Sequence, residues 1–157
     1  MLRITLRNPL RHWVAASLSD NGKELEVLGW GVPVDVIRDF VDAVQSLQAV
    51  NQADCCWYQD QGEMHWNLRR NGKDIEVEIL EFAEVDFPGK HRGEAVSVFK
   101  SRTQWITFAR QLLSSLESIQ TDMGREGYER AWRHPFPTEA HEKLRSAIKR
   151  ERGISSS

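Results

Sequence analysis

The sequence SRTQWITFARQLLSSLESIQTDMGREGYERAWRHPFP, residues 101–137, decides the fold of the last third of the chain. Its first part places apolar side chains three and four residues apart, which is the spacing of one helix face. Ser101 and Gln104 have the spacing of a capping box, and Gly124 is a residue type that often ends a helix. The pattern predicts a long helix before Gly124, with a stripe of Trp105, Phe108, Ala109, Leu112, Leu113, Leu116, Ile119 and Met123.

Aromatic residues follow at intervals of four, at Tyr128, Trp132 and Phe136. Tyr128 and Trp132 predict a short helix that packs back on the core, because residues four apart share a helix face. Pro135 and Pro137 then end it. We interpret the three rings as a packing clasp that closes the helical layer over a sheet. If one of them were exposed, it would instead be a strong anchor for a partner.

Strands dominate the chain before this stretch. Arg3 to Asn8 alternates polar and apolar residues, and the segments 13–18 and 25–30 flank Asp20-Asn21-Gly22-Lys23. Asn-Gly supplies the positive φ angles of a tight turn, so these two segments predict a hairpin. Helical spacing predicts a helix over about 33–49, with Pro33 in its first turn and Asp35 near its positive end.

A second group of strands follows this helix. Segment 55–59, a strand with Met64, Trp66 and Leu68 on one face, and an alternating strand over 74–79 predict two further hairpins. Residues 83–94 contain Pro88, Gly89 and Gly93 among charges and predict a mobile loop. Residues 96–99 predict a last short strand. A final helix starts near Thr138 and ends at Gly153.

The order of these elements predicts an α+β fold: an antiparallel meandering sheet, helices packed on one of its faces, and a C-terminal helical segment. We expect a single domain over residues 1–153, followed by a flexible tail at 154–157. A length of 157 residues is sufficient for one hydrophobic core.

Composition narrows the classes of function. With a net charge of −2, the chain has no general attraction for nucleic acid or anionic lipid. The N-terminus lacks the apolar run of a signal peptide, and no stretch approaches the roughly 20 apolar residues of a membrane span. The cysteines, Cys55 and Cys56, are adjacent and poorly placed for a mutual disulfide. We therefore expect a soluble cytoplasmic protein with no membrane or nucleic-acid partner.

The residues that could carry chemistry form no specific motif. No HExxH, CxxC pair, phosphate-binding loop or GxSxG occurs, so we expect no metal, no cofactor and no catalytic residue. A weaker alternative remains open. His65 would lie on the strand next to Cys56, where an imidazole could act as the base for a thiol nucleophile in a small enzyme of unknown reaction.

Acidic residues are the most distinctive surface feature. Six carboxylates occur with no Lys or Arg between the first and the last: Asp74, Glu76, Glu78, Glu81, Glu84 and Asp86. Strand alternation predicts that the first three project from one face. They are either a solvated strand face or a negative surface that binds a basic partner. Asp35, Asp39 and Asp42, which share one face of the expected helix, are a second candidate. The basic residues after Lys143 fit a helix C-terminus better than a nucleic-acid surface.

Residues 101–144 resemble the C-terminal part of immunity proteins from bacterial polymorphic toxin and contact-dependent inhibition systems. The resemblance depends on the Trp105/Phe108/Leu112/Leu116 helix, on Gly127-Tyr128, Trp132 and Phe136-Pro137, and on a short terminal helix. These motifs are structural rather than chemical, and they identify no subfamily.

The resemblance implies a binding protein without enzymatic activity. Such a protein neutralises one cognate toxin, often a basic nuclease, by masking its active site. The six carboxylates are then the candidate contacts with the toxin, a choice that depends on their charge alone. A structural or adaptor domain is a further alternative. The toxin's identity and the oligomeric state stay open.

Overall fold

The computed structural model describes the backbone of residues 1–60, 62–82, 84–87, 90–92 and 94–156, and the side chains outside 61, 83–93 and 155–157. Its helices are α1 (Val36–Ser46), α2 (Trp105–Trp132) and α3 (Thr138–Ser156). Its strands are β1 (Arg3–Leu6), β2 (Trp13–Asp20), β3 (Lys23–Trp30), β4 (Gln52–Tyr58), β5 (Glu63–Asn71), β6 (Asp74–Phe82), β7 (Glu84–Phe87), β8 (Lys90–Arg92) and β9 (Val96–Gln104).

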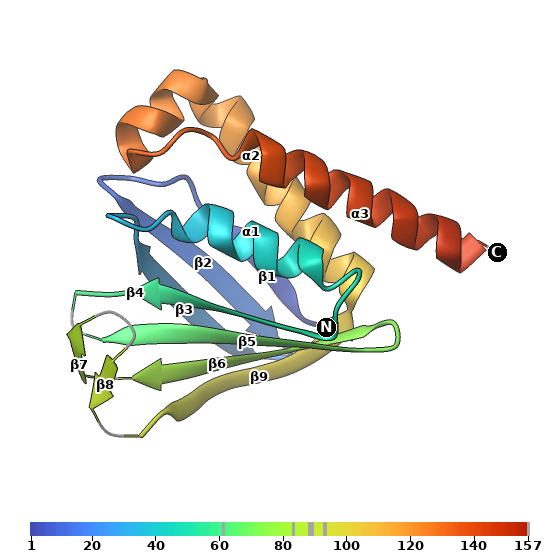
Figure 1. Ribbon diagram of the computed structural model, residues 1–157, viewed down its shortest axis with the longest axis horizontal. Coiled ribbons are helices and arrows are strands. Elements are labelled where there is room, and N and C mark those ends of the chain that lie inside the picture. Colours follow the sequence, from blue (N-terminus) through green and yellow to red (C-terminus); the bar gives the residue numbers. More distant parts are fainter. Residues whose placement is uncertain (61, 83, 88–89, 93, 157) are drawn as a thin grey trace.

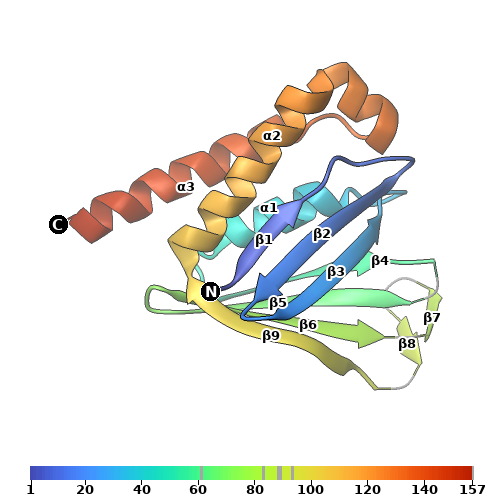
Figure 2. The same cartoon turned by 180° about the vertical axis from the view of Figure 1, so that it is seen from behind.

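The predicted α+β class is confirmed. Within the described residues, the strands form antiparallel sheets with the orders β1-β2-β3 and β4-β5-β6-β9, and a short β7-β8 ladder. The sequence predicted one meander, but β3 does not pair with β4, and the chain passes from the first sheet to the second through α1. Figures 1 and 2 show the helices on one side of the four-stranded sheet; the three-stranded sheet crosses behind α1 in Figure 1 and in front of it in Figure 2.

The predicted hairpins are present. Asp20 pairs with Lys23, and Asn21 and Gly22 between them have φ values of 47° and 89°, as a tight primed turn requires. The last strand, β9, covers Val96–Gln104 and is longer than the predicted strand at 96–99. The expectation of a loop at 83–94 is wrong for the backbone of β7 and β8, where the alternation of Glu84-Val85-Asp86-Phe87 is itself a strand pattern.

Two helix starts differ from their predictions. Helix α1 begins at Val36 rather than at Pro33, because the Asp35 side chain caps it by accepting a hydrogen bond from the Arg38 N–H at 3.1 Å. The predicted capping box of α2 is wrong. Ser101 and Gln104 instead extend β9 along β6, and the Ser101 hydroxyl donates a hydrogen bond to the Asp20 carboxylate.

The sequence predicted that Gly124 and Gly153 end helices, and only Gly124 interrupts one. Gly124 has φ 69° and ψ 168°, so it ends the long helix as predicted, and a short helix continues to Trp132. Gly153 does not end α3, which continues to Ser156. Glu151 in the last turns of α3 forms a largely buried ion pair with Arg70 of β5, and this contact holds the helix end against the sheet. The predicted flexible tail partly lies outside the described residues.

The aromatic clasp is confirmed. Tyr128 and Trp132 are fully buried, Phe136 is 7% exposed, and the Tyr128 and Phe136 rings lie 5.3 Å apart. The Trp132 indole N–H donates to Asp35 Oδ1 at 2.9 Å, and its ring covers Gly31. The clasp therefore joins the end of α2 to the segment that leads into α1.

The core beneath the helices is rich in large rings. The ring centres of Trp57 on β4 and Trp66 on β5 lie 5.2 Å apart, and both rings contact Phe40 of α1.

Among the described residues, no helix combines the length and the apolar run that crossing a bilayer requires.

We expect Gly31→Ala to destabilise the fold. A Cβ at this position would lie 2.6 Å from the Trp132 ring, which is itself enclosed by the core. Overpacking of this kind costs about 1–3 kcal/mol in the free energy of unfolding, measurable by urea denaturation. Gly153→Ala is the matched control, because no described atom lies within 4 Å of that Cβ and alanine favours a helix. Equal stability of the two variants would contradict the clasp.

Candidate functional site

The carboxylates of β6 occupy both faces of the sheet. Strand alternation places Asp74, Glu76 and Glu78 on the face away from the helices, as predicted, and Glu81 on the opposite face with the buried Ile75, Val77 and Ile79. The side chains of Glu84 and Asp86 lie outside the described residues. The six predicted contacts therefore do not share a single described surface.

Basic residues from the neighbouring strands accompany these carboxylates. Lys100 Nζ lies 3.8 Å from Glu76 Oε1, and Arg102 Nη1 lies 3.9 Å from Asp74 Oδ2. Asp74 and Glu76 also line a pocket of about 320 Å³ together with Arg69, Arg70 and Arg102. The charge on this face is mixed, so the long-range field of β6 is weaker than its sequence indicates. Its role in partner binding stays a prediction.

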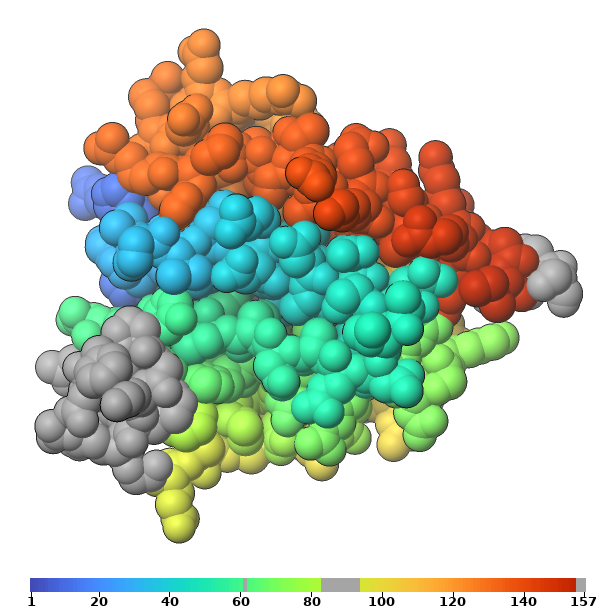
Figure 3. Space-filling model, in the orientation of Figure 1, coloured from blue at the N-terminus to red at the C-terminus, as the bar shows by residue number. Residues whose placement is uncertain are grey.

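A second acidic surface lies between α1 and β4. Asp39 and Asp42 from the helix and Asp54 from the strand line a groove of about 430 Å³, and none of its described lining residues is Lys or Arg. Figure 3 shows α1 and β4 next to one another on the face that carries this groove. Burial raises the pKa of Asp42, against the opposing effect of Lys143 and Arg38 nearby. The third aspartate of the predicted helix set, Asp35, is buried and caps α1 instead.

Strand β4 is an edge of the four-stranded sheet, and one side of its backbone faces the groove region. The hydrogen bonds from Arg70 N to Asn51 O and from Gln59 N to Gly62 O fix the odd-numbered residues as those bonded to β5. Alternation in an antiparallel ladder then turns the N–H and C=O groups of Asp54 and Cys56 outward. Within the described residues, these groups have no backbone partner.

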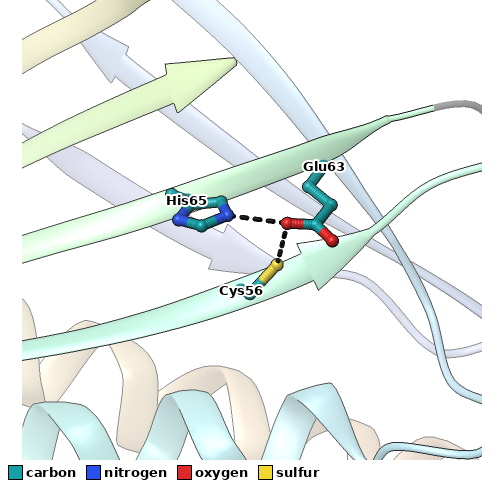
Figure 4. A group of neighbouring side chains, drawn as sticks. All are labelled: Cys56, Glu63 and His65. Carbon is teal, nitrogen blue, oxygen red and sulfur yellow. Dashed lines mark hydrogen bonds and ion pairs between the residues drawn. The ribbon is translucent and has the colours of Figure 1, made fainter. Parts of the chain in front are cut away.

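The third constellation joins Cys56, Glu63 and His65 (Figure 4). Cys56 pairs with His65 in the β4–β5 register, and Glu63 lies two residues before His65 on the same face of β5. The Glu63 carboxylate stands between the other two groups: its Oε2 is 3.2 Å from Cys56 Sγ and 2.8 Å from His65 Nε2. The Glu63 side chain is only 1% exposed, whereas that of His65 is 28% exposed.

This geometry does not activate Cys56 as a nucleophile. Burial, followed by the hydrogen bond that the thiol donates to Glu63, raises the pKa of Cys56 well above its ordinary value. The imidazole of His65 contacts Glu63 rather than the thiol. A catalytic thiol needs a lowered pKa and an adjacent base, so the expected Cys56–His65 pair lacks both features.

Sequence reasoning missed Glu63. Its signal was local: a carboxylate two residues before His65 shares that residue's face on a strand, and Cys56 lies on the partner strand. Reasoning that paired only cysteine with histidine left it out.

Comparison of the chain with family models, curated proteins and solved structures gave no match.

We expect Glu63→Gln to lower the pKa of the Cys56 thiol, because the substitution removes the negative charge beside it. Alkylation of Cys56 by iodoacetamide at pH 8, with a chelator present, should become severalfold faster. Both proteins would carry Cys55→Ser so that only one thiol reacts. An unchanged rate in folded protein would show that the carboxylate does not control this thiol.

Proposed function

We propose that the protein acts by binding another protein, as an immunity protein that neutralises a cognate bacterial toxin by covering its active site. The resemblance of residues 101–144 supports this class of function. The observation that carries the proposal is the acidic groove beside the edge of β4 that pairs with no described strand. The backbone groups of such an edge can form main-chain hydrogen bonds with an added strand, and the acidic side chains select a partner segment of positive charge.

The groove fits an extended, basic segment of the partner. Such a segment would add a strand to β4 by pairing with the outward backbone groups of Asp54 and Cys56. Its Lys or Arg side chains would reach Asp39 and Asp42. Burying a cation beside Asp42 would also favour the ionised form of a carboxyl group whose pKa is raised in the free protein.

The same charges disfavour self-association through this edge. A second copy of the chain would bring its own Asp54 and its own groove aspartates to the shared strand pair, and like charges across a pair are destabilising. Toxins that act on nucleic acid are often basic, and the aspartates would attract such a partner, although Arg38 and Lys143 nearby offset part of this charge. The cytoplasm, where such toxins act, is the proposed location of the complex.

The test is a binding measurement with the C-terminal domain of the large secreted protein expected from the gene immediately upstream. We predict a 1:1 complex and rescue of growth when both proteins are co-expressed. Neutralising the groove by Asp39→Asn with Asp42→Asn should weaken binding about tenfold or more, which corresponds to about 1.4 kcal/mol. The effect should diminish at high salt.

Glu76→Gln with Glu78→Gln is the matched control, since it removes the same charge from the mixed face of β6. We expect this variant to bind nearly as well as the wild-type protein. If the β6 variant loses affinity and the groove variant does not, the sequence-based contact set is the correct surface. Absence of both a complex and growth rescue would contradict the immunity function itself.

A further inference from the structure

We propose that Cys56, Glu63 and His65 bind one divalent transition-metal ion of the zinc class. The proposal depends on the geometry of these three side chains and is independent of the proposed binding function. Their potential ligand atoms, one sulfur, one oxygen and one nitrogen, all lie within 4.8 Å of one another. They come from two directly paired strands, so sheet pairing itself brings them together.

The spacing is close to that of a tetrahedral site. Zinc–sulfur bonds of about 2.3 Å and zinc–nitrogen or zinc–oxygen bonds of about 2.0–2.1 Å place neighbouring donors roughly 3.3–3.6 Å apart. Cys56 Sγ and Glu63 Oε2 are 3.2 Å apart, and His65 Nε2 and Glu63 Oε2 are 2.8 Å apart. To admit the ion, side-chain torsions need to widen the first distance by about 0.4 Å and the second by about half an ångström. They also need to bring Cys56 Sγ and His65 Nε2, which lie within 4.8 Å of each other, to a similar spacing.

The donor set selects the class of metal. A thiolate and an imidazole favour zinc and its neighbours in the transition series over magnesium or calcium, which prefer oxygen. Three protein ligands fill three tetrahedral positions, and the partly exposed His65 leaves a route from solvent to the fourth. Binding would replace the thiol proton of Cys56 with a sulfur–metal bond, and the proton would pass to solvent.

The surroundings hold the ligands in place. The Glu63 carboxylate is buried. Burying such a charge is costly unless a cation or hydrogen-bond donors compensate it. A divalent ion would add to the compensation that the Cys56 thiol and the His65 imidazole already supply through their contacts with Glu63. The Phe82 ring lies 4.6 Å from the His65 ring and limits its rotation. Trp57, next to Cys56 in the chain, is fully buried in the core and anchors this part of β4.

The experiment is a titration of the metal-free full chain with Co²⁺, followed by competition with Zn²⁺. Cobalt reports thiolate ligation through a sulfur-to-metal charge-transfer absorption in the near ultraviolet. We expect one ion per chain, the thiolate absorption, and displacement of cobalt by zinc. Cys56→Ser should abolish the absorption, and Glu63→Gln and His65→Asn should each weaken binding at least tenfold.

Cys55→Ser is the matched control. Cys55 is adjacent in sequence but projects to the opposite face of β4, so this variant should keep both the absorption and the affinity. Circular dichroism identifies variants that fail to fold, and the near-isosteric Glu63→Gln keeps the test decisive if Cys56→Ser unfolds. Absence of cobalt–thiolate absorption in the wild-type protein, or absorption lost with Cys55 and kept without Cys56, would overturn the proposal.

Discussion

The carboxylate of Asp35 is the contact on which the arrangement of the helices depends. One of its oxygens accepts hydrogen bonds from both the Arg38 backbone N–H and the Trp132 indole N–H. The first bond starts α1, and the second fixes the end of α2 against the segment that precedes α1. Because Asp35 is buried, loss of either donor would leave a desolvated charge with reduced compensation. Trp132 and Gly31 complete this joint by direct contact of the ring with the backbone. This joint fixes the start of α1, and the packing of Phe40 against Trp57 and Trp66 then places the helix over the four-stranded sheet, beside the acidic groove.

The two candidate sites meet at Cys56 of β4, whose backbone belongs to the groove edge and whose thiol belongs to the cluster. The groove uses the outward backbone groups of the strand and the aspartates of α1, whereas the Cys56–Glu63–His65 cluster lies on the face away from the helices. An unpaired edge invites association with other chains, and acidic side chains around it restrict which chains can approach. Under the proposed function, Asp39, Asp42 and Asp54 would both protect the edge and select a basic partner. A metal ion in the cluster would cross-link β4 to β5 and stiffen the strand that the partner engages.

Local patterns predicted much of this fold, and long-range contacts account for what they missed. The Asn21-Gly22 hairpin, the apolar stripe of α2 and the Tyr128–Trp132–Phe136 clasp follow from spacing within one segment. Asp35 was predicted with Asp39 and Asp42 as part of an exposed face, because nothing local reveals that Trp132 contacts it. Ser101 has capping-box spacing, yet pairing of β9 with β6 determines its conformation. The acidic run on β6 predicted a negative surface, but the sequence pattern did not reveal that Lys100 and Arg102 lie beside it. Local spacing puts Glu63 on the same strand face as His65, but its contact with Cys56 depends on the register between β4 and β5.

Amide hydrogen exchange at Asp54 and Cys56 is the most direct test of partner binding through the β4 edge. Their N–H groups face away from β5 and have no backbone partner within the described residues, so both should exchange rapidly in the free protein. In the complex with the toxin domain, we predict that strand addition slows exchange at both residues by at least about tenfold. Slowed exchange confined to other surfaces, with Asp54 and Cys56 unchanged, would contradict binding through the β4 edge.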